Sequence, residues 1–472
     1  MEQVARNDLI DLEIESAAFE GTTVGRLDRL VVFVPYAVPG DRVRARVVKR
    51  RRKYVEAVVE EVLRPSPDRI PPRCSHFGTC GGCRLQNVAY ERQLEDKREQ
   101  VADLLERIGH FQDPPVAATI PSPTPYFYRN KMEFSFGNRR WLTREEIDAD
   151  VPIDRDFALG LHIPGRFDRI LDLEECYLQC DWTSRLIHRV RQVAREQHWE
   201  AYDTIENRGY LRNLVIRVGR QTDQCMVVLV TTSAEPDRLR IFERCVRDEF
   251  PQVTTLINAV NSTRSPVASG EEMQVAFGPG YLEERIGDQL FRVTPTAFFQ
   301  PNTLQAERLF DVVGTFTQAS PDDLLFDLYC GLGSIGLLLA SSVRRVVGVE
   351  SLPEAVRLAK LNAERNGVDN ASFFAGDALM ALKPDFQRRN GRPDVVVLDP
   401  PRVGLHPDVL QALVRTKPRR IVYTSCNPAT LARDLEVLSQ GYELEAVQPV
   451  DMFPQTFHIE AVAALGRKDG TA

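Results

Sequence analysis

Long hydrophobic runs are missing from this 472-residue chain. A bilayer span needs roughly 18 or more consecutive apolar residues with few charges, and no stretch of the sequence supplies them. The first residues, MEQVARND, also lack the apolar core of a secretory signal. We therefore expect a cytoplasmic protein with no membrane partner.

An excess of positive charge is missing too, because the formal net charge is -7. This weakens any claim that the whole surface attracts nucleic acid, so basic contacts have to be sought locally. The nine cysteines are an odd number. In a reducing compartment they indicate metal sites or catalytic thiols and argue against a disulfide framework.

The chain is long enough for two or three domains. Residues 1–66 contain short apolar runs broken by glycine and proline, which predicts a small OB-like β-barrel. Residues 67–290 have mixed patterns, with an amphipathic helix at about 89–110, and predict an α+β central domain. Residues 291–472 repeat strand, loop and helix, which is typical of a doubly wound α/β sheet.

Basic residues cluster in the barrel region at 42–53 (RVRARVVKRRRK). Such a run is either a solvated face or an RNA contact, since phosphate contacts supply much of nucleic-acid affinity. Residues 128–131 (YRNK) and 211–214 (LRNL) are further candidate RNA contacts, although each is equally compatible with a charge beside a core strand.

A nucleotide pocket is predicted by four polar positions, each following a probable strand. The segment 327–336 (DLYCGLGSIG) has the glycines for a tight turn, and Glu350 ends the next strand, where it suits ribose hydroxyls. Asp377 and Asp399 follow the third and fourth strands, facing adenine and the same crevice. A dinucleotide and S-adenosylmethionine both fit the glycine spacing, and the Asp-Pro-Pro turn at Asp399 favours the methyl donor.

Cys426 follows a short apolar strand at 420–423 and precedes an Asn-Pro turn, so it should lie at the ligand-binding edge of the sheet. Arg402 stands where many amine methyltransferases carry a base-stacking aromatic residue, which argues against amino-group methylation. Carbon 5 of uracil, by contrast, needs a thiolate added at carbon 6 before it can take a methyl group. His458 and Glu460 are the candidate bases that would then remove the carbon 5 proton.

A second group of cysteines, Cys74, Cys80 and Cys83, lies between glycines in the central region. Glycines free the backbone to wrap around an inorganic centre. A zinc ion with a fourth thiol and an iron-sulfur cluster are both compatible with this spacing.

These motifs, in this order, resemble the bacterial RNA 5-methyluridine methyltransferase family over most of the chain. The resemblance implies a Rossmann-like S-adenosylmethionine-dependent methyltransferase domain and a TRAM domain at the amino-terminal barrel. It implies Cys426 as the nucleophile and Glu460 as the proton acceptor. Cofactor contacts are implied at Gln300, Tyr329, Ser334, Glu350 and Asp399, beside Asp377 near the adenine.

The same resemblance implies a [4Fe-4S] cluster with Cys176 as fourth ligand, although Cys180 is only four residues away. Members that bear a cluster act mainly on large-subunit ribosomal RNA, so 23S rRNA is expected in preference to tRNA. We expect a monomer without protein partners. The competing hypothesis from another class is a non-catalytic iron-sulfur RNA-binding protein, which would not need Cys426, Glu460 and a cofactor pocket together.

Overall fold

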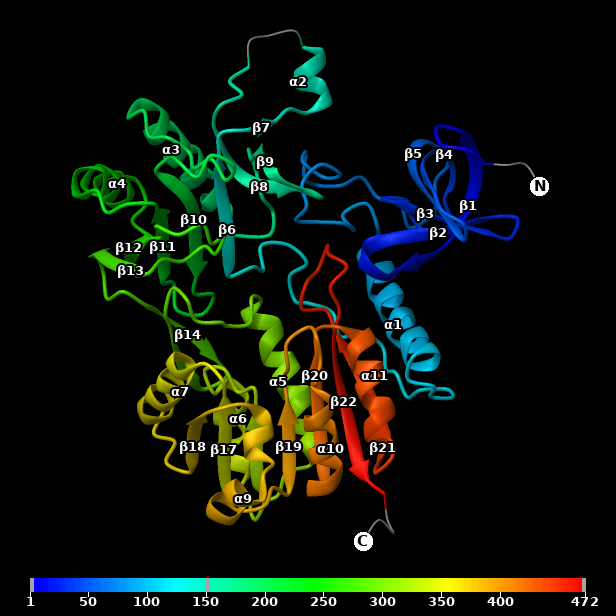
Figure 1. The fold of residues 1–472 in the computed structure, drawn as a ribbon, viewed down its shortest axis with the longest axis vertical. Helices are drawn as coiled ribbons and strands as arrows, with labels where there is room; N and C mark the ends of the chain where they lie inside the picture. The colour runs from blue at the N-terminus through cyan, green and yellow to red at the C-terminus, as the bar shows by residue number, and fades with distance from the viewer. Residues whose placement is uncertain (1–3, 150–152, 469–472) are drawn as a thin grey trace.

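The structure, a computed structural model, describes residues 4–149 and 153–468. Figure 1 shows three groups of elements: an amino-terminal barrel, a central sheet, and a carboxyl-terminal sheet with helices around it. Within the described ranges, no helix combines the length and the apolar character that crossing a bilayer requires.

Five strands close the amino-terminal barrel in the order β1-β2-β3-β5-β4. Burial alternates along β1 and β4, so one side of each strand faces an apolar interior that includes Val32, Val43 and Val55. The predicted small barrel is therefore present. Its strands are β1 (Leu9–Ala18), β2 (Thr22–Leu27), β3 (Leu30–Pro35), β4 (Arg42–Arg50) and β5 (Tyr54–Arg64).

An eight-stranded mixed sheet forms the centre, in the order β13-β12-β11-β10-β6-β8-β9-β7. Leu186 of α3 and Phe242 of α4 are buried in the same core as Leu214 of β10, so helices cover this sheet. The elements are α2 (Arg144–Asp148), α3 (Trp182–Glu196), α4 (Pro236–Glu249), β6 (Lys131–Gly137), β7 (Arg140–Trp141), β8 (Ala158–Ile163), β9 (Arg166–Asp172), β10 (Leu211–Val218), β11 (Cys225–Thr231), β12 (Thr255–Val260) and β13 (Glu272–Phe277). A hairpin of β14 (Leu282–Ile286) and β15 (Gln289–Val293) follows.

The carboxyl-terminal sheet has seven strands in the order β18-β17-β16-β19-β20-β22-β21. The first five are parallel, and β22 inserts antiparallel between β20 and β21. This confirms the predicted doubly wound class. The strands are β16 (Leu324–Leu328), β17 (Arg345–Glu350), β18 (Ala371–Ala375), β19 (Val395–Leu398), β20 (Arg420–Ser425), β21 (Tyr442–Val450) and β22 (Glu460–Arg467).

Helices cover both faces of this sheet (Figure 1). Neighbouring residues of one strand enter opposite cores: Val346 of β17 packs with α5, α6 and α7, whereas Val347 packs with α8 to α11. The helices are α5 (Thr303–Thr317), α6 (Ser334–Leu339), α7 (Pro353–Arg365), α8 (Ala378–Ala381), α9 (Pro384–Asn390), α10 (Pro407–Thr416) and α11 (Pro428–Leu438).

Helix α1 (Tyr90–Arg107) packs on the carboxyl-terminal sheet although it is far from it in sequence. Val101 shares a core with Leu431 of α11. Lys97 is buried, and its Nζ lies 2.6 Å from Oδ1 of Asp451, directly after β21. The Tyr90 hydroxyl donates to the other carboxylate oxygen of Asp451 at 2.8 Å. Both oxygens of this buried carboxylate are thus satisfied by α1.

Lys97→Met should lower the thermal unfolding midpoint measured by calorimetry. It leaves Asp451 as an uncompensated buried charge, and breaking such a pair costs about 3–5 kcal/mol. Adding Asp451→Asn should recover part of the loss, because the buried charge is then gone. Lys360→Met, on the exposed side of α7, serves as control and should change stability by less than about 0.5 kcal/mol. A Lys97→Met protein as stable as this control would contradict a stabilising role of the Lys97–Asp451 ion pair.

Candidate active site

Cys426 and Glu460 come from adjacent strands of the carboxyl-terminal sheet. Cys426 follows the end of β20 and precedes α11, whose N-cap residue is Asn427. Strand β22 begins at Glu460 and runs antiparallel to β20, with Ser425 opposite Ala461. In an antiparallel pair, the residue after Ser425 lies beside the residue before Ala461. This register therefore brings the thiol and the carboxyl group together.

Charge is disfavoured on both members of this pair. Burial, and then the nearby charges of Glu460 and Asp399, raises the pKa of Cys426 to about 11. Burial, and then Asp399, raises the pKa of Glu460 well above its usual value. The Arg402 guanidinium lowers the pKa of Cys426 and of Glu460. Both groups therefore favour their neutral forms, and Arg402 is a cation placed to favour the thiolate.

One oxygen of Glu460 has nothing to bind. Its Oε1 is buried and has no hydrogen-bond partner within the described part of the chain. A buried carboxyl oxygen without a hydrogen bond lowers the stability of the folded protein. We therefore infer that a bound substrate supplies the missing hydrogen-bond partner.

His458 is the other candidate base. Burial, followed by the positive charges of Arg402 and Arg129, lowers the pKa of His458 to about 4, so the imidazole is neutral at physiological pH. Its ring packs on Phe457, with the two centroids 4.3 Å apart. Of the two candidates, Glu460 is the one whose charge acts on Cys426.

Residues 451–459, here called the β21–β22 loop, connect β21 to β22. Residues from the first quarter of the chain form hydrogen bonds with this loop. The carbonyl oxygen of Gln455 accepts hydrogen bonds from the backbone N–H groups of Arg84 (2.9 Å) and Leu85 (3.1 Å). The Gln93 side chain on α1 donates to Oε1 of Gln455 (3.1 Å) and accepts from its N–H (3.2 Å). Elements far from the carboxyl-terminal sheet in sequence thus position the loop that leads into Glu460.

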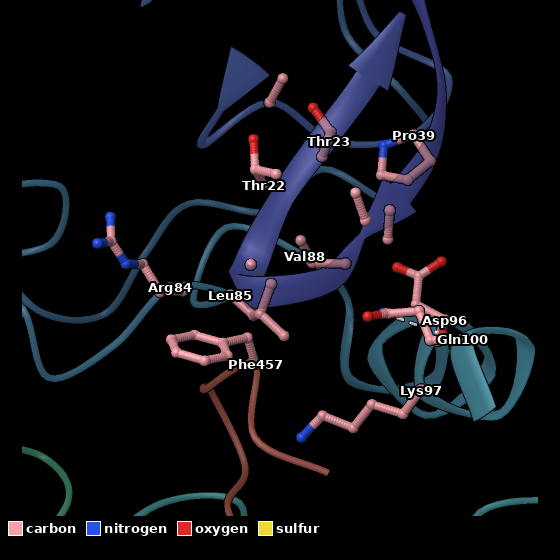
Figure 2. Close-up of a pocket in the computed structure, with 14 residues that line it drawn as sticks. Thr22, Thr23, Pro39, Arg84, Leu85, Val88, Asp96, Lys97, Gln100 and Phe457 are labelled. Atoms are coloured by element: carbon pink, nitrogen blue, oxygen red, sulfur yellow. Dashed lines mark hydrogen bonds between the residues drawn. The ribbon is translucent and has the colours of Figure 1, made fainter. Parts of the chain in front are cut away.

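Figure 2 shows the cavity where the barrel, α1 and this loop meet. Thr23 of the barrel, Leu85, Lys97 of α1 and Phe457 of the loop all line it. The barrel approaches closely, because a Cβ on Gly21 (φ +71°) would lie 3.0 Å from Cβ of Phe457. Glycine is therefore needed at this contact for space and for backbone conformation.

The loop after β16 has a backbone shaped for the close approach of a ligand. Tyr329, Gly331 and Gly333 have positive φ angles of 65°, 52° and 80°, and this region is strained for tyrosine. A Cβ on Gly331 would meet nothing within 4 Å, so the backbone here borders open space. Glu350, at the end of β17, accepts a hydrogen bond from the Gly331 N–H at 3.2 Å. The loop and the carboxylate thus border one site.

Three carboxyl groups converge beside this loop. Asp327 is buried; its Oδ2 accepts from the Gly336 N–H at 2.9 Å, and its Oδ1 has no partner among the described residues. Burial, with the charges of Asp399 and Glu350, raises the pKa of Asp327 to about 7. Burial also raises the pKa of Asp399 to about 7. Such a site favours a ligand that carries positive charge and hydroxyl donors.

The other predicted cofactor residues lie around the same strand ends. Gln300 precedes α5, and its carbonyl oxygen accepts from Nδ2 of Asn130 at 2.8 Å. Ser334 is the first residue of α6. The Asp377 carboxylate caps α8, and its charge raises the pKa of Tyr329, which places the two side chains near each other.

Four cysteine thiols gather at the edge of the central sheet. Cys74, Cys80 and Cys83 lie in one glycine-rich turn, and Cys176 approaches from the segment after β9. The charges of the other three all act on the pKa of Cys83, which burial first raises to about 12. The predicted quartet is therefore brought together by the fold.

Cys180, the alternative fourth ligand, has other neighbours. Its sulfur accepts a hydrogen bond from Nη1 of Arg220 at 3.1 Å, and its charge acts on Cys225. Within the described residues, no three His, Cys, Asp or Glu side chains are arranged to hold a metal ion. These neighbours favour Cys176 over Cys180 as the fourth member of the quartet.

The predicted basic face of the barrel strands is neutralised by carboxylates. Arg44 pairs with Asp11 (2.9 Å) and Arg46 pairs with Glu60 (2.6 Å). The exposed hairpin residues 50–53, three arginines and one lysine, form no ion pair within the described part of the chain. Free positive charge on this barrel is therefore concentrated at the β4–β5 hairpin.

Most of the other candidate RNA contacts are structural. The buried Tyr128 hydroxyl donates to the carbonyl oxygen of Pro454 at 3.0 Å, and the buried Arg212 donates to the carbonyl oxygen of Asn261 at 2.9 Å. Asn130 holds the Gln300 segment, as described above. The sequence did not predict that Arg402 lies near Cys426 and Glu460. Its position directly after the Asp-Pro-Pro turn was the one feature of the sequence that could have indicated this.

Comparison with known proteins agrees with this geometry. Residues 265–468 match the model of the tRNA (uracil-5-)-methyltransferase family, and residues 3–59 match the TRAM domain. An uncharacterized RNA methyltransferase of Bacteroides thetaiotaomicron is 40% identical over 95% of this chain and 99% of its own. One from Chlorobaculum tepidum is 41% identical over 98% of this chain and 97% of its own.

A solved structure extends the likeness to the whole fold. The Pyrococcus abyssi tRNA (uracil-54, C5)-methyltransferase, in complex with S-adenosyl-L-homocysteine, is 30% identical over 97% of this chain and 100% of its own, with a TM-score of 0.74. This likeness supports S-adenosylmethionine as the methyl donor. The chain therefore belongs to the tRNA (uracil-5-)-methyltransferase family of S-adenosylmethionine-dependent RNA methyltransferases and carries a TRAM domain at its amino terminus.

Proposed function

We propose that this protein methylates carbon 5 of a specific uridine in 23S ribosomal RNA through a covalent bond between Cys426 and carbon 6. The observation that carries the proposal is the unpartnered Oε1 of Glu460 beside Cys426. A nucleophile and a base side by side at the ligand-binding edge of the sheet match the two needs of this reaction.

The chemistry assigns one task to each residue. Burial favours the neutral forms of both groups, so Cys426 and Glu460 each have to lose a proton to solvent before they react. The Cys426 thiolate then forms a bond to carbon 6, and the electron pair of the 5,6 double bond moves into an enolate. Carbon 5 then takes the methyl group, whose bond to the donor sulfur breaks. The Glu460 carboxylate removes the carbon 5 proton, the double bond re-forms and the thiolate leaves. Arg402 supports the first step because its charge favours the thiolate.

The methyl donor fits the glycine-loop site. A positively charged sulfonium and two ribose hydroxyls suit the convergence of Asp327, Glu350 and Asp399, where one buried Asp327 oxygen is unpaired. The residues that would hold it are Gln300, Tyr329, Ser334, Glu350, Asp377 and Asp399. S-Adenosylmethionine supplies the activated methyl group when bound.

The cysteine quartet fits a [4Fe-4S] cluster held by Cys74, Cys80, Cys83 and Cys176. The four thiols are partly buried and lie close enough for the charge of one to raise the pKa of another, as Cys176 does for Cys74, Cys80 and Cys83. Backbone N–H groups already point at these sulfurs, as in Gly82 to Cys80 at 3.3 Å, and such bonds are a feature of iron-sulfur sites. The proposed methyl transfer needs no electron, so the role of the cluster is structural.

Ribosomal RNA is the proposed substrate because the cysteine quartet is complete, as in the cluster-bearing members that the sequence resembles. Transfer RNA is the second candidate, favoured by the likeness to the Pyrococcus abyssi enzyme, which is named for a tRNA uridine. Both candidates use the same residues.

Variants of the reactive pair should separate the two halves of the reaction on RNA that contains 5-fluorouridine. The native protein should form a covalent complex, because fluorine at carbon 5 cannot leave as a proton. Cys426→Ala should form none and lose methyl transfer while still binding cofactor. On ordinary RNA, Glu460→Gln should retain a methylated adduct and turn over about 10²–10⁴-fold more slowly. Denaturing gels and peptide mass spectrometry measure each species.

Glu443→Gln, on the exposed side of β21, is the matched control for Glu460 and should turn over like the native protein. Failure of the native protein to become linked to 5-fluorouridine RNA at Cys426, with donor present, would contradict the mechanism.

For the cluster, Cys74→Ser in protein prepared without air should bleach the broad absorbance near roughly 400 nm that sulfur-to-iron charge transfer produces. Cys180→Ser should keep it, because Cys180 contacts Arg220 and not the quartet. Iron and zinc analysis gives an independent measure. A colourless native protein that contains zinc would refute the cluster.

The substrate is identified by mapping 5-methyluridine in total RNA from a strain that lacks this chain. We expect a missing methyl group in 23S ribosomal RNA that returns with the native gene and not with Cys426→Ala. Loss confined to tRNA would reject the ribosomal assignment and keep the chemistry.

A further inference from the structure

Asp434 on α11 is a fully buried carboxylate to which the proposed reaction gives no task. Both of its oxygens accept hydrogen bonds. Oδ2 accepts from the backbone N–H of Leu405 at 2.8 Å and from the hydroxyl of Tyr423 at 2.7 Å. Oδ1 accepts from Nε and Nη2 of Arg433, at 2.9 and 2.7 Å. One carboxylate thus joins the helix after Cys426, the strand before it and the loop that follows the Asp-Pro-Pro turn.

That loop, residues 402–405 and here called the Arg402 loop, is bound at its start to the first turn of α11. Nδ2 of Asn427 donates to the carbonyl oxygen of Arg402 at 3.0 Å, and Oγ1 of Thr430 donates to the same oxygen at 3.3 Å. Asn427 directly follows Cys426 in the chain. These contacts therefore place the backbone of Arg402 beside the turn that carries the thiol.

The rest of the Arg402 loop rests on the ion pair of Asp434 with Arg433. Nη2 of Arg433 also donates to the carbonyl oxygen of Val403 at 3.0 Å. The side chain of Val403 is 73% exposed, so polar contacts and not apolar packing hold the loop at this residue. Gly404 has a φ angle of +75°, and a Cβ there would lie 2.6 Å from both Oδ2 of Asp434 and Nη2 of Arg433. The loop backbone is therefore packed directly on the ion pair.

We propose that Asp434 is a positioning residue, which fixes the Arg402 loop against the turn at Cys426 and so keeps the guanidinium of Arg402 near the thiol. The inference rests on the proposed function only in taking Cys426 as the nucleophile. A cation near a thiol favours the thiolate, and Arg402 lowers the pKa of Cys426. The side chain of Arg402 is exposed, so it would be free to move away once the loop is released.

The rate at which iodoacetamide alkylates Cys426 in the RNA-free protein tests this role. Trypsin releases residues 421–433 (IVYTSCNPATLAR), whose one cysteine is Cys426, so mass spectrometry follows this thiol apart from the others. Asp434→Asn offers one acceptor oxygen in place of two and must release either Arg433 or the loop. We expect alkylation at least about twofold slower at each mildly alkaline pH, since a pKa about half a unit higher leaves about threefold less thiolate, which is somewhat more reactive.

Two further variants show whether Asp434 acts through Arg402. Gly404→Ala displaces the loop while Asp434 stays in place, and it should slow alkylation by a similar factor. Arg402→Gln should slow it too, and adding Asp434→Asn to Arg402→Gln should change the rate no further, because residues that act through one another are not additive. Glu436→Gln, exposed on the same helix, is the matched control and should react like the native protein.

A merely structural role predicts a different result. Asp434→Asn and Gly404→Ala would then lower the thermal unfolding midpoint and still be alkylated at the native rate, which would overturn the proposal. A loss that adds to the loss in Arg402→Gln would overturn it as well. Where Asp434→Asn does not fold, Gly404→Ala gives the same decision. No RNA or methyl donor is present in this measurement, so its outcome is distinct from failure of the native protein to form the covalent complex with 5-fluorouridine RNA.

Discussion

The antiparallel insertion of β22 beside β20 is the constraint on which the proposed active site depends. In a fully parallel sheet, the carboxyl end of each strand faces the ligand, and each strand supplies residues from that end alone. Because β22 runs the other way, its first residue, Glu460, reaches the same edge as Cys426, which follows the last residue of β20. The pairing of β20 with β22 therefore makes Cys426 and Glu460 neighbours.

The loop that enters β22 is supported from outside the catalytic sheet. Gln455 is bound by the segment that follows the cysteine turn and by α1, and Phe457 lies against Gly21 of the barrel. The barrel, the segment after Cys83 and α1 thus all contact the loop that leads into Glu460. The barrel and α1 therefore support the loop before Glu460, in addition to any contact that they make with RNA.

Features with a local pattern could be predicted from the sequence, and those that depend on distant partners could not. The apolar strand before Asp327, the glycine loop and Glu350 each carry their own signal, and the structure has them where expected. The ion pairs of the barrel arginines with Asp11 and Glu60 could not be predicted from the sequence, because these partners lie on neighbouring strands. The reversed direction of β22 was hidden as well, since an apolar strand reads alike in both directions. The domain limits at 66 and 290 stay a prediction.

The packing of α1 against the end of β21 also affects how the chain folds during its synthesis. Lys97 and Asp451 are separated by 354 residues, an interval of roughly 20–70 s at about 5–20 residues per second. During that time the lysine on α1 lacks its carboxylate, and the apolar side of the helix lacks its sheet. The nascent helix can therefore dock on the carboxyl-terminal sheet only when the ribosome has nearly finished the protein.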